Sequence, residues 1–83
     1  MDIKREIEIK NEMVRYLSES YGWTEEEILG AQRFDDLGLD SLSLYSLVEE
    51  CESKFNIELE INDITDIDSP ERFIKYISER INL

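Results

Sequence analysis

Apolar side chains recur at helical spacing near the start of the chain. They predict one apolar face of a helix, formed by Ile9, Met13, Tyr16 and Leu17. Ile3 and Ile7 extend this face toward the N-terminus. We expect the helix to end near Gly22, because glycine accepts the left-handed conformation often found just past a helix end.

A second helical pattern begins beside a serine in the middle of the chain. We expect this helix to start at Asp40 or Ser41, because either side chain can accept hydrogen bonds from the free backbone amides of a first turn. The predicted buried stripe consists of Leu42, Tyr45, Val48, Cys51 and Phe55, with Leu47 at its margin and Leu44 near the surface. The other face presents Glu49, Glu50 and Glu52.

The final helix has the clearest start signal. Ser69 can cap it, Pro70 fits the first helical position because it has no amide hydrogen, and Glu71 favours the positive end of the helix dipole. The predicted buried face consists of Phe73, Ile74, Ile77 and Ile81, with Tyr76 at the edge.

A long connection joins the first two helices. Thr24 and Glu27 have the spacing of a capping box, which predicts a short helical turn through Ile28 and Leu29. Long loops in compact domains are commonly functional or disordered. An ordered loop that is pinned to the core is favoured by five large apolar side chains, namely Trp23, Ile28, Leu29, Phe34 and Leu37.

Apolar and acidic residues alternate from Ile57 to Ile61, as in a strand. A lone strand in an otherwise helical chain would leave its backbone groups unpaired, so we expect an extended loop instead. A short helix should then open at Asn62 or Asp63 and run through Ile64 and Ile67. The prediction is one all-α domain, residues 1–83, folded as an antiparallel bundle of three longer helices plus a short third helix.

Charge and composition exclude several classes of function. The 21 acidic and 9 basic residues give a net charge of −12, which repels nucleic acid and anionic membranes and favours basic protein surfaces as partners. No apolar run approaches the roughly 20 residues of a membrane span. The lone Cys51 is interpreted as a reduced, buried residue, which favours a cytoplasmic protein.

Ser41 stands where a glycine-bearing loop gives way to the second helix. A catalytic serine needs a base, usually histidine, and the chain contains no histidine. The sequence also offers no metal cluster and no phosphate-cradling glycine loop, so we do not expect an enzyme. Ser41 is therefore interpreted as a residue that another protein modifies.

The segment Asp36-Leu37-Gly38-Leu39-Asp40-Ser41-Leu42 resembles the attachment motif of acyl carrier proteins. The resemblance covers nearly the whole chain, including the first apolar stripe, the loop with Phe34, the helix end at Phe55 and the final segment 73–77. It implies an acyl-carrier-protein-like four-helix bundle. It also implies a 4'-phosphopantetheine arm that a separate phosphopantetheinyl transferase attaches to Ser41, with Asp40 helping the transferase to engage.

Such an arm carries acyl intermediates as thioesters, for fatty acid, polyketide or related biosynthesis. We expect electrostatic docking to basic patches on acyl-transferring and condensing enzymes, through Leu42, Leu44, Glu49, Glu50, Glu52, Asp35 and Asp36. The candidates for sheltering an acyl chain are Val48, Ile57 and Ile67, which also fit as plain core residues. A shuttle that visits several enzymes is expected to be a monomer.

Alternatives remain at this point. Ser43 and Ser46 stand where fatty-acid-synthesis carriers typically have acidic residues, which favours a specialised stand-alone carrier, D-alanyl or other aminoacyl carriers included. An unmodified acidic protein-interaction module would explain the charge but not the junction of loop, serine and helix. A calcium-binding loop is disfavoured, because neither 36–40 nor 63–68 has the required ligand spacing.

Overall fold

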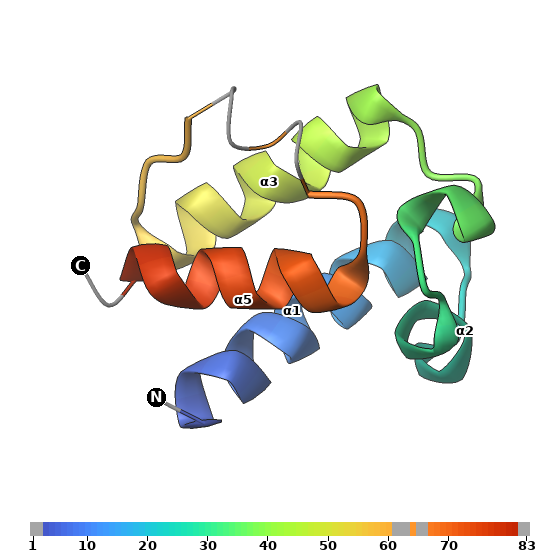
Figure 1. The fold of residues 1–83 in the computed structure, drawn as a ribbon, viewed down its shortest axis with the longest axis horizontal. Coiled ribbons are helices and arrows are strands. Elements are labelled where there is room, and N and C mark those ends of the chain that lie inside the picture. The colour runs from blue at the N-terminus through green and yellow to red at the C-terminus, as the bar shows by residue number, and fades with distance from the viewer. Residues whose placement is uncertain (1–2, 61–63, 65–66, 82–83) are drawn as a thin grey trace.

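The computed structural model describes residues 3–60, 64 and 67–81. Its helices are α1 (Ile3–Tyr21), α2 (Glu25–Gly30), α3 (Ser41–Phe55) and α5 (Pro70–Ile81), with a 3₁₀ turn, η1, at Phe34–Leu37. Figure 1 shows α3 and α5 running in the same direction, and both run opposite to α1. No strand occurs in these residues, and Ile57 to Glu60 form a loop, as predicted.

α1 lies at the centre of the fold and packs against α2, α3 and α5. The predicted apolar face is confirmed, since Ile9, Met13 and Leu17 are fully buried and Tyr16 packs against them. Ile3 and Ile7 belong to the helix but not to its buried face, because both side chains are exposed. At 100° per residue, Ile3 and Ile7 lie roughly 120° and 160° around the helix axis from Ile9, and so on the face turned away from the core.

The predicted helix ends are confirmed by their hydrogen bonds. α1 stops before Gly22, which has a φ of 76°. Thr24 caps α2 in a complete capping box with Glu27. At α5, the Ser69 hydroxyl accepts a hydrogen bond from the Arg72 amide at 3.1 Å, and Pro70 is the first helical residue.

The predicted buried stripe of α3 is partly wrong. Leu42 is 77% exposed, whereas Leu47 is fully buried and Leu44 packs against the core. Three residues advance a helix by about 300°, so each step of three rotates the side chain by roughly 60°. Three such steps carry Leu42 to the side opposite Cys51. The observed stripe mixes steps of three and four, and contains Leu44, Leu47, Val48, Cys51 and Phe55. Tyr45 is half-buried and packs against the core, as predicted.

The loop between α2 and α3 is pinned to the core, as predicted, by most of the expected side chains. Ile28 and Phe34 are buried, and Trp23 and Leu37 pack against the core. Leu29 is the exception, with 41% of its surface exposed. It follows Ile28 on the short α2, about 100° around the helix axis, and lies outside the face that packs against the core.

Two residues that precede α5, Ile64 and Ile67, belong to the hydrophobic core. Ile64 is helical and buried, and Ile67 is buried as well. The Ile64 amide donates to the Glu60 carbonyl at 3.3 Å, and the Ile67 amide donates to the Ile64 carbonyl at 3.0 Å. The start of the short helix that we expected at Asn62 or Asp63 lies outside the described residues.

An ion cluster joins α1 to α3. Arg15 binds Glu12 and Glu19 on its own helix, and its Nη2 lies 2.9 Å from Glu50 Oε1 on α3. Glu12 is buried, and its hydrogen bond to Arg15 is the main reason that the pKa of the Glu12 carboxyl lies below its ordinary value. Arg15 therefore holds a buried carboxylate and ties together two long helices.

Candidate functional site

Ser41 is the first residue of α3, and its side chain is exposed. The turn before it places the serine there. Gly38 has a φ of 82°, a left-handed conformation that side chains disfavour, and its amide closes η1 by donating to the Asp35 carbonyl at 3.0 Å. Leu39 then turns inward and is only 5% exposed. Burying Leu39 anchors the chain just before the serine emerges.

The same turn is bound to the residues just before α5 and to α5 itself. The Phe34 amide donates to the Asp68 carbonyl at 2.8 Å, immediately before α5. The Phe34 ring meets the Phe73 ring edge to face, with centroids 6.3 Å apart. The loop that carries the Ser41 motif is therefore held by backbone and core contacts to α5.

Asp40 caps α3, as predicted. Its Oδ1 accepts a hydrogen bond from the Ser43 amide at 2.8 Å, and its carbonyl accepts one from the Leu44 amide at 3.0 Å. The bond from Ser43 is the main cause that lowers the pKa of the Asp40 carboxyl below its ordinary value. Asp40 is thus a fixed negative charge directly before Ser41.

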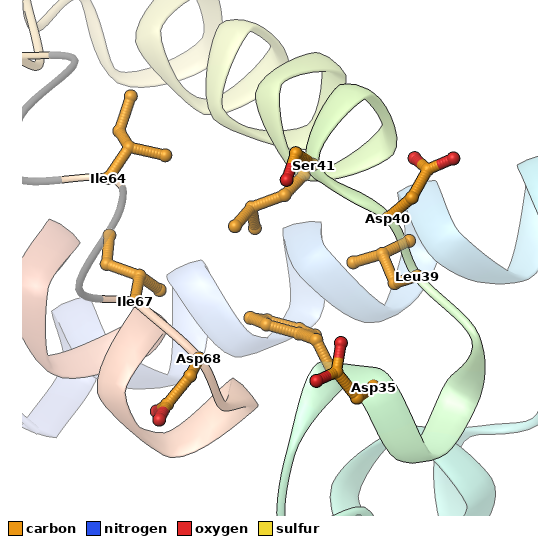
Figure 2. A pocket seen from close by; sticks show the side chains of 9 residues that line it. Asp35, Leu39, Asp40, Ser41, Ile64, Ile67 and Asp68 are labelled. Atoms are coloured by element: carbon orange, nitrogen blue, oxygen red, sulfur yellow. The ribbon is translucent and has the colours of Figure 1, made fainter.

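Ser41 lies at the edge of a pocket of about 380 Å³ between the start of α3 and the start of α5. Figure 2 shows Ile64 and Ile67 on one side of this pocket, and Leu39 and Asp40 on the other. Its walls are apolar inside and acidic at the rim, and they consist of Phe34, Asp35, Leu39, Asp40, Ser41, Leu44, Ile64, Ile67 and Asp68. A group attached to Ser41 could therefore rest against an apolar surface.

The residues expected to shelter an acyl chain are only partly brought together. Ile67 lines the pocket beside Ser41. Val48 is fully buried in the core and Ile57 is half-buried, and neither lines this pocket. Sequence reasoning missed Phe34, Leu39 and Asp68 as its walls. The available signal was the large apolar side chain of Phe34 in the loop before Ser41, which the sequence alone led us to interpret only as an anchor of that loop.

The carboxylates expected to dock partner enzymes differ in whether they are engaged in contacts within the fold. The Glu50 carboxylate is held by Arg15, and Glu52 Oε2 accepts a hydrogen bond from the Leu59 amide at 3.0 Å. Asp36 accepts from the Arg33 amide at 3.2 Å. Glu49 and Asp35 are exposed, and the closest cation to Asp35 lies 4.0 Å away. Among these carboxylates, Asp35 and Glu49 are therefore the most available to a partner protein.

Leu42 and Leu44 lie on different sides of α3. Leu42 faces solvent beside Ser41, with 77% of its surface exposed. Leu44 is half-buried and lines the pocket. Only Leu42 is placed to meet an approaching protein without a rearrangement of α3.

Among the described residues, neither a reactive thiol nor a metal-binding cluster accompanies Ser41. Cys51 is buried, and this burial raises the pKa of its thiol to about 12, so the thiol stays protonated. Within residues 3–60, 64 and 67–81, no group of acidic, cysteine or histidine side chains could hold a metal ion. No helix in that part of the chain is long and apolar enough to cross a membrane.

A phosphate ester at Ser41 fits the residues that surround it. The hydroxyl is accessible, and it sits at the N-terminus of a 15-residue helix, where the helix dipole favours negative charge. The first turn of α3 contains no acidic residue, which limits repulsion on that side. Asp40 opposes the ester electrostatically, but its carboxylate is directed to the Ser43 amide.

Comparison with known proteins identifies the family. Residues 11–77 match the family model described as "Phosphopantetheine attachment site". The chain is 32% identical over 75 residues to an acyl carrier protein of Thermotoga maritima, which covers 89% of this chain and 93% of that protein. It is 34% identical over 74 residues to an acyl carrier protein of Chloroherpeton thalassium, covering 88% and 92%.

A solved structure has the same fold. A crystal structure of an acyl carrier protein from Thermotoga maritima superposes with a TM-score of 0.83 at 22% identity, covering 99% of this chain and 96% of that one. The helical fold is thereby confirmed as that of an acyl carrier protein. This chain belongs to the acyl carrier protein family, whose members have a phosphopantetheine attachment site.

Proposed function

We propose that this protein, as a single domain of residues 1–83, carries acyl groups on a 4'-phosphopantetheine arm esterified to Ser41. The observation that carries the proposal is the exposed Ser41 hydroxyl at the first position of α3, inside the segment that the family model matches. The arm supplies a terminal thiol on which acyl groups ride as thioesters. The protein performs no reaction of its own and works in the cytoplasm.

The chain's own residues present the arm. Leu39 and Phe34 hold the loop on the core, and Asp40 caps the helix so that Ser41 keeps a fixed position. Asp40 also serves the transferase, because its carboxylate is ionised and adjacent to the reacting hydroxyl. Since the helix N-terminus favours the new phosphate, no large rearrangement is required of α3.

Docking is centred on the end of α3 that bears Ser41. Leu42 gives an apolar contact, and Asp35, Asp36 and Glu49 give exposed negative charge for basic patches on partner enzymes. Individual exposed charge pairs contribute only about 0–1 kcal/mol, so the patch acts collectively and lets partners leave quickly. Glu50 and Glu52 contribute less, because both are engaged within the fold.

A specialised carrier is a second candidate, favoured by the surface of α3. Ser46 is exposed and its hydroxyl donates to the Leu42 carbonyl at 3.2 Å, and Ser43 is half-buried. Because Ser43 and Ser46 carry no charge, this part of α3 suits partner enzymes that differ from those of a strongly acidic carrier. D-alanyl or other aminoacyl groups are the alternative cargo.

The test is loading with coenzyme A and a phosphopantetheinyl transferase, followed by intact-mass measurement. The wild type should gain the mass of one phosphopantetheine, and Ser41→Ala should gain nothing. Ser46→Ala is the matched control and should load like the wild type. Loading of Ser41→Ala, or failure of the wild type to load, would mean that Ser41 is not the attachment point.

A thiol titration gives an independent readout. Because Cys51 is buried with a raised pKa, the folded unmodified chain should react with a thiol reagent only through unfolding. The loaded chain should show one fast-reacting thiol, that of the arm. A fast-reacting thiol in both forms would contradict the burial of Cys51.

A further inference from the structure

Three of the chain's cations line a second groove. Arg33, Arg72 and Lys75 surround a cavity of about 490 Å³, whose other walls are Gln32, Asp68, Ser69 and Glu71. Three cations and two carboxylates leave this groove with a charge of +1, in a chain with only 9 Lys and Arg residues and a net charge of −12. An anionic group that approaches this protein is therefore repelled less here than at its acidic surfaces.

The groove adjoins the pocket of Ser41. Asp68 is a wall of both cavities, and Figure 2 shows it across the pocket from Ser41. A phosphopantetheine arm has roughly fourteen bonds between the serine oxygen and the sulfur, which extend to on the order of 15 Å. The pocket is small beside that length. The end of an arm on Ser41 can therefore cross the pocket and reach the groove.

The two guanidinium groups keep donors available. Arg33 Nη2 lies 3.9 Å from Asp68 Oδ2 and 4.0 Å from Asp35 Oδ2, which is longer than a hydrogen bond. Arg72 Nη1 lies 3.4 Å from Asp68 Oδ1. Each guanidinium has five N–H donors, and both side chains are more than half exposed, at 60% and 67%. A carboxylate can bind them without breaking a buried contact.

We propose that this groove receives the carboxylate end of an acidic acyl group carried on the Ser41 arm, the half-thioester of a dicarboxylic acid. This inference rests on the proposed function of Ser41. Pairs between exposed charges are individually weak, but a short tether raises the local concentration of the carboxylate to the millimolar range. An uncharged acyl end has no such attraction and rests on the apolar wall formed by Leu39, Leu44 and Ile67.

The experiment compares two cargoes that differ only in charge. Arms that end in a succinyl amide or in its methyl ester are loaded on the wild-type chain, with the amide preventing hydrolysis, and nitrogen–proton NMR spectra are recorded. The N–H signals of Arg33, Arg72 and Lys75 should shift several-fold more with the acid than with the ester. Half-molar salt should reduce the difference, because it shortens the screening length to about 4 Å.

Charge variants locate the effect. The double variant Arg72→Gln/Lys75→Gln should lose most of the carboxylate-specific shift at Arg33. Lys54→Gln, which removes an exposed cation near the end of α3, is the matched control and should keep it. Retention of the shift in the double variant would overturn the assignment to this groove.

The remaining outcomes separate the two proposals. Loading is first checked by mass; a wild-type chain that cannot be loaded rejects both the function of Ser41 and this inference. A loaded chain whose acid and ester spectra agree rejects the groove alone. The same shifts produced by free succinate at low millimolar concentration, without an arm, would show a general anion site and overturn the role of the tether.

Discussion

The surroundings of Arg15 and those of Ser41 differ in what they do with polar groups. Around Arg15, a buried carboxylate and two others converge on one guanidinium, and fully buried Met13 and Leu47 belong to the adjacent core. Around Ser41, the polar side chains face solvent or line an open pocket, and the apolar side chains of the pocket wall, such as Leu39 and Phe34, reach the core. One region joins helices, whereas the other presents a hydroxyl.

The contrast means that one region determines the stability of the fold, whereas the other determines how the Ser41 hydroxyl is exposed to a modifying enzyme. The core surrounds α1, so changes there should alter folding and leave the chemistry at Ser41 intact in the molecules that remain folded. Changes at the Ser41 junction should alter loading and should cost less stability than changes in the core. Substitutions in the two regions should therefore have separable effects on stability and on loading.

Phe73→Ala should have the largest effect. The ring is fully buried and contacts Phe34, so its removal leaves a cavity and should lower the free energy of unfolding by about 3–5 kcal/mol. Urea denaturation followed by circular dichroism measures this. Leu42→Ala is the matched control, because its exposed side chain should cost less than about 0.5 kcal/mol. Equal losses in the two variants would contradict the assignment of core and surface.

Arg15→Met should have the next largest effect. It leaves Glu12 buried without its main partner, and the melting temperature should fall by roughly 10 °C at neutral pH. Calorimetry measures the change. Lys54→Met, which removes a cation at an exposed position, should lower the melting temperature much less.

Acid should erase the difference between Arg15→Met and the wild type. The pKa of Glu12 is lowered in the folded protein from its ordinary value of 4.5, so the contribution of the pair is present above pH 4.5. It is lost as the pH falls through the lowered value. Melting temperatures of the two chains should therefore converge at pH values well below 4.5. A gap that stays constant with pH would mean that the Glu12 charge is not what Arg15 stabilises.

Two substitutions of Asp40 separate its role as a helix cap from the role of its negative charge. Asp40→Ala removes the bond from the Ser43 amide and should lower the melting temperature by about 4–8 °C. Asp40→Asn keeps a capping oxygen and should restore most of that stability. Both variants should load more slowly than the wild type if the carboxylate serves the transferase, as measured by initial rates from intact mass. A normal loading rate for Asp40→Asn would limit Asp40 to capping.

Most of the fold followed from local signals in the sequence. Gly22, Thr24, Ser69 and Pro70 fixed helix ends through backbone chemistry that needs no tertiary information. The inward face of α3 did not follow, because the predicted stripe ran in steps of three, which drift by roughly 60° each and extended the stripe to the exposed Leu42.

The candidate site was also only partly predictable from the sequence. Ser41 and its capping residue Asp40 could be predicted, because a motif and a helix start coincide there. The walls of the pocket could not be predicted. Phe34 and Asp68 are far apart in sequence, and they meet through the hydrogen bond that joins η1 to the start of α5. Likewise, Glu50 could be recognised as an internal partner of Arg15 only once α1 and α3 were placed together.

The most direct test of the account is to locate the modification on the unmutated chain. The loaded protein is digested, and fragment ions of the peptide spanning residues 34–54 are sequenced by tandem mass spectrometry, which distinguishes Ser41 from Ser43, Ser46 and Ser53. We expect the phosphopantetheine on Ser41 alone. Its presence on another of these serines, or its absence from the peptide, would contradict the claim that the start of α3 is the attachment point.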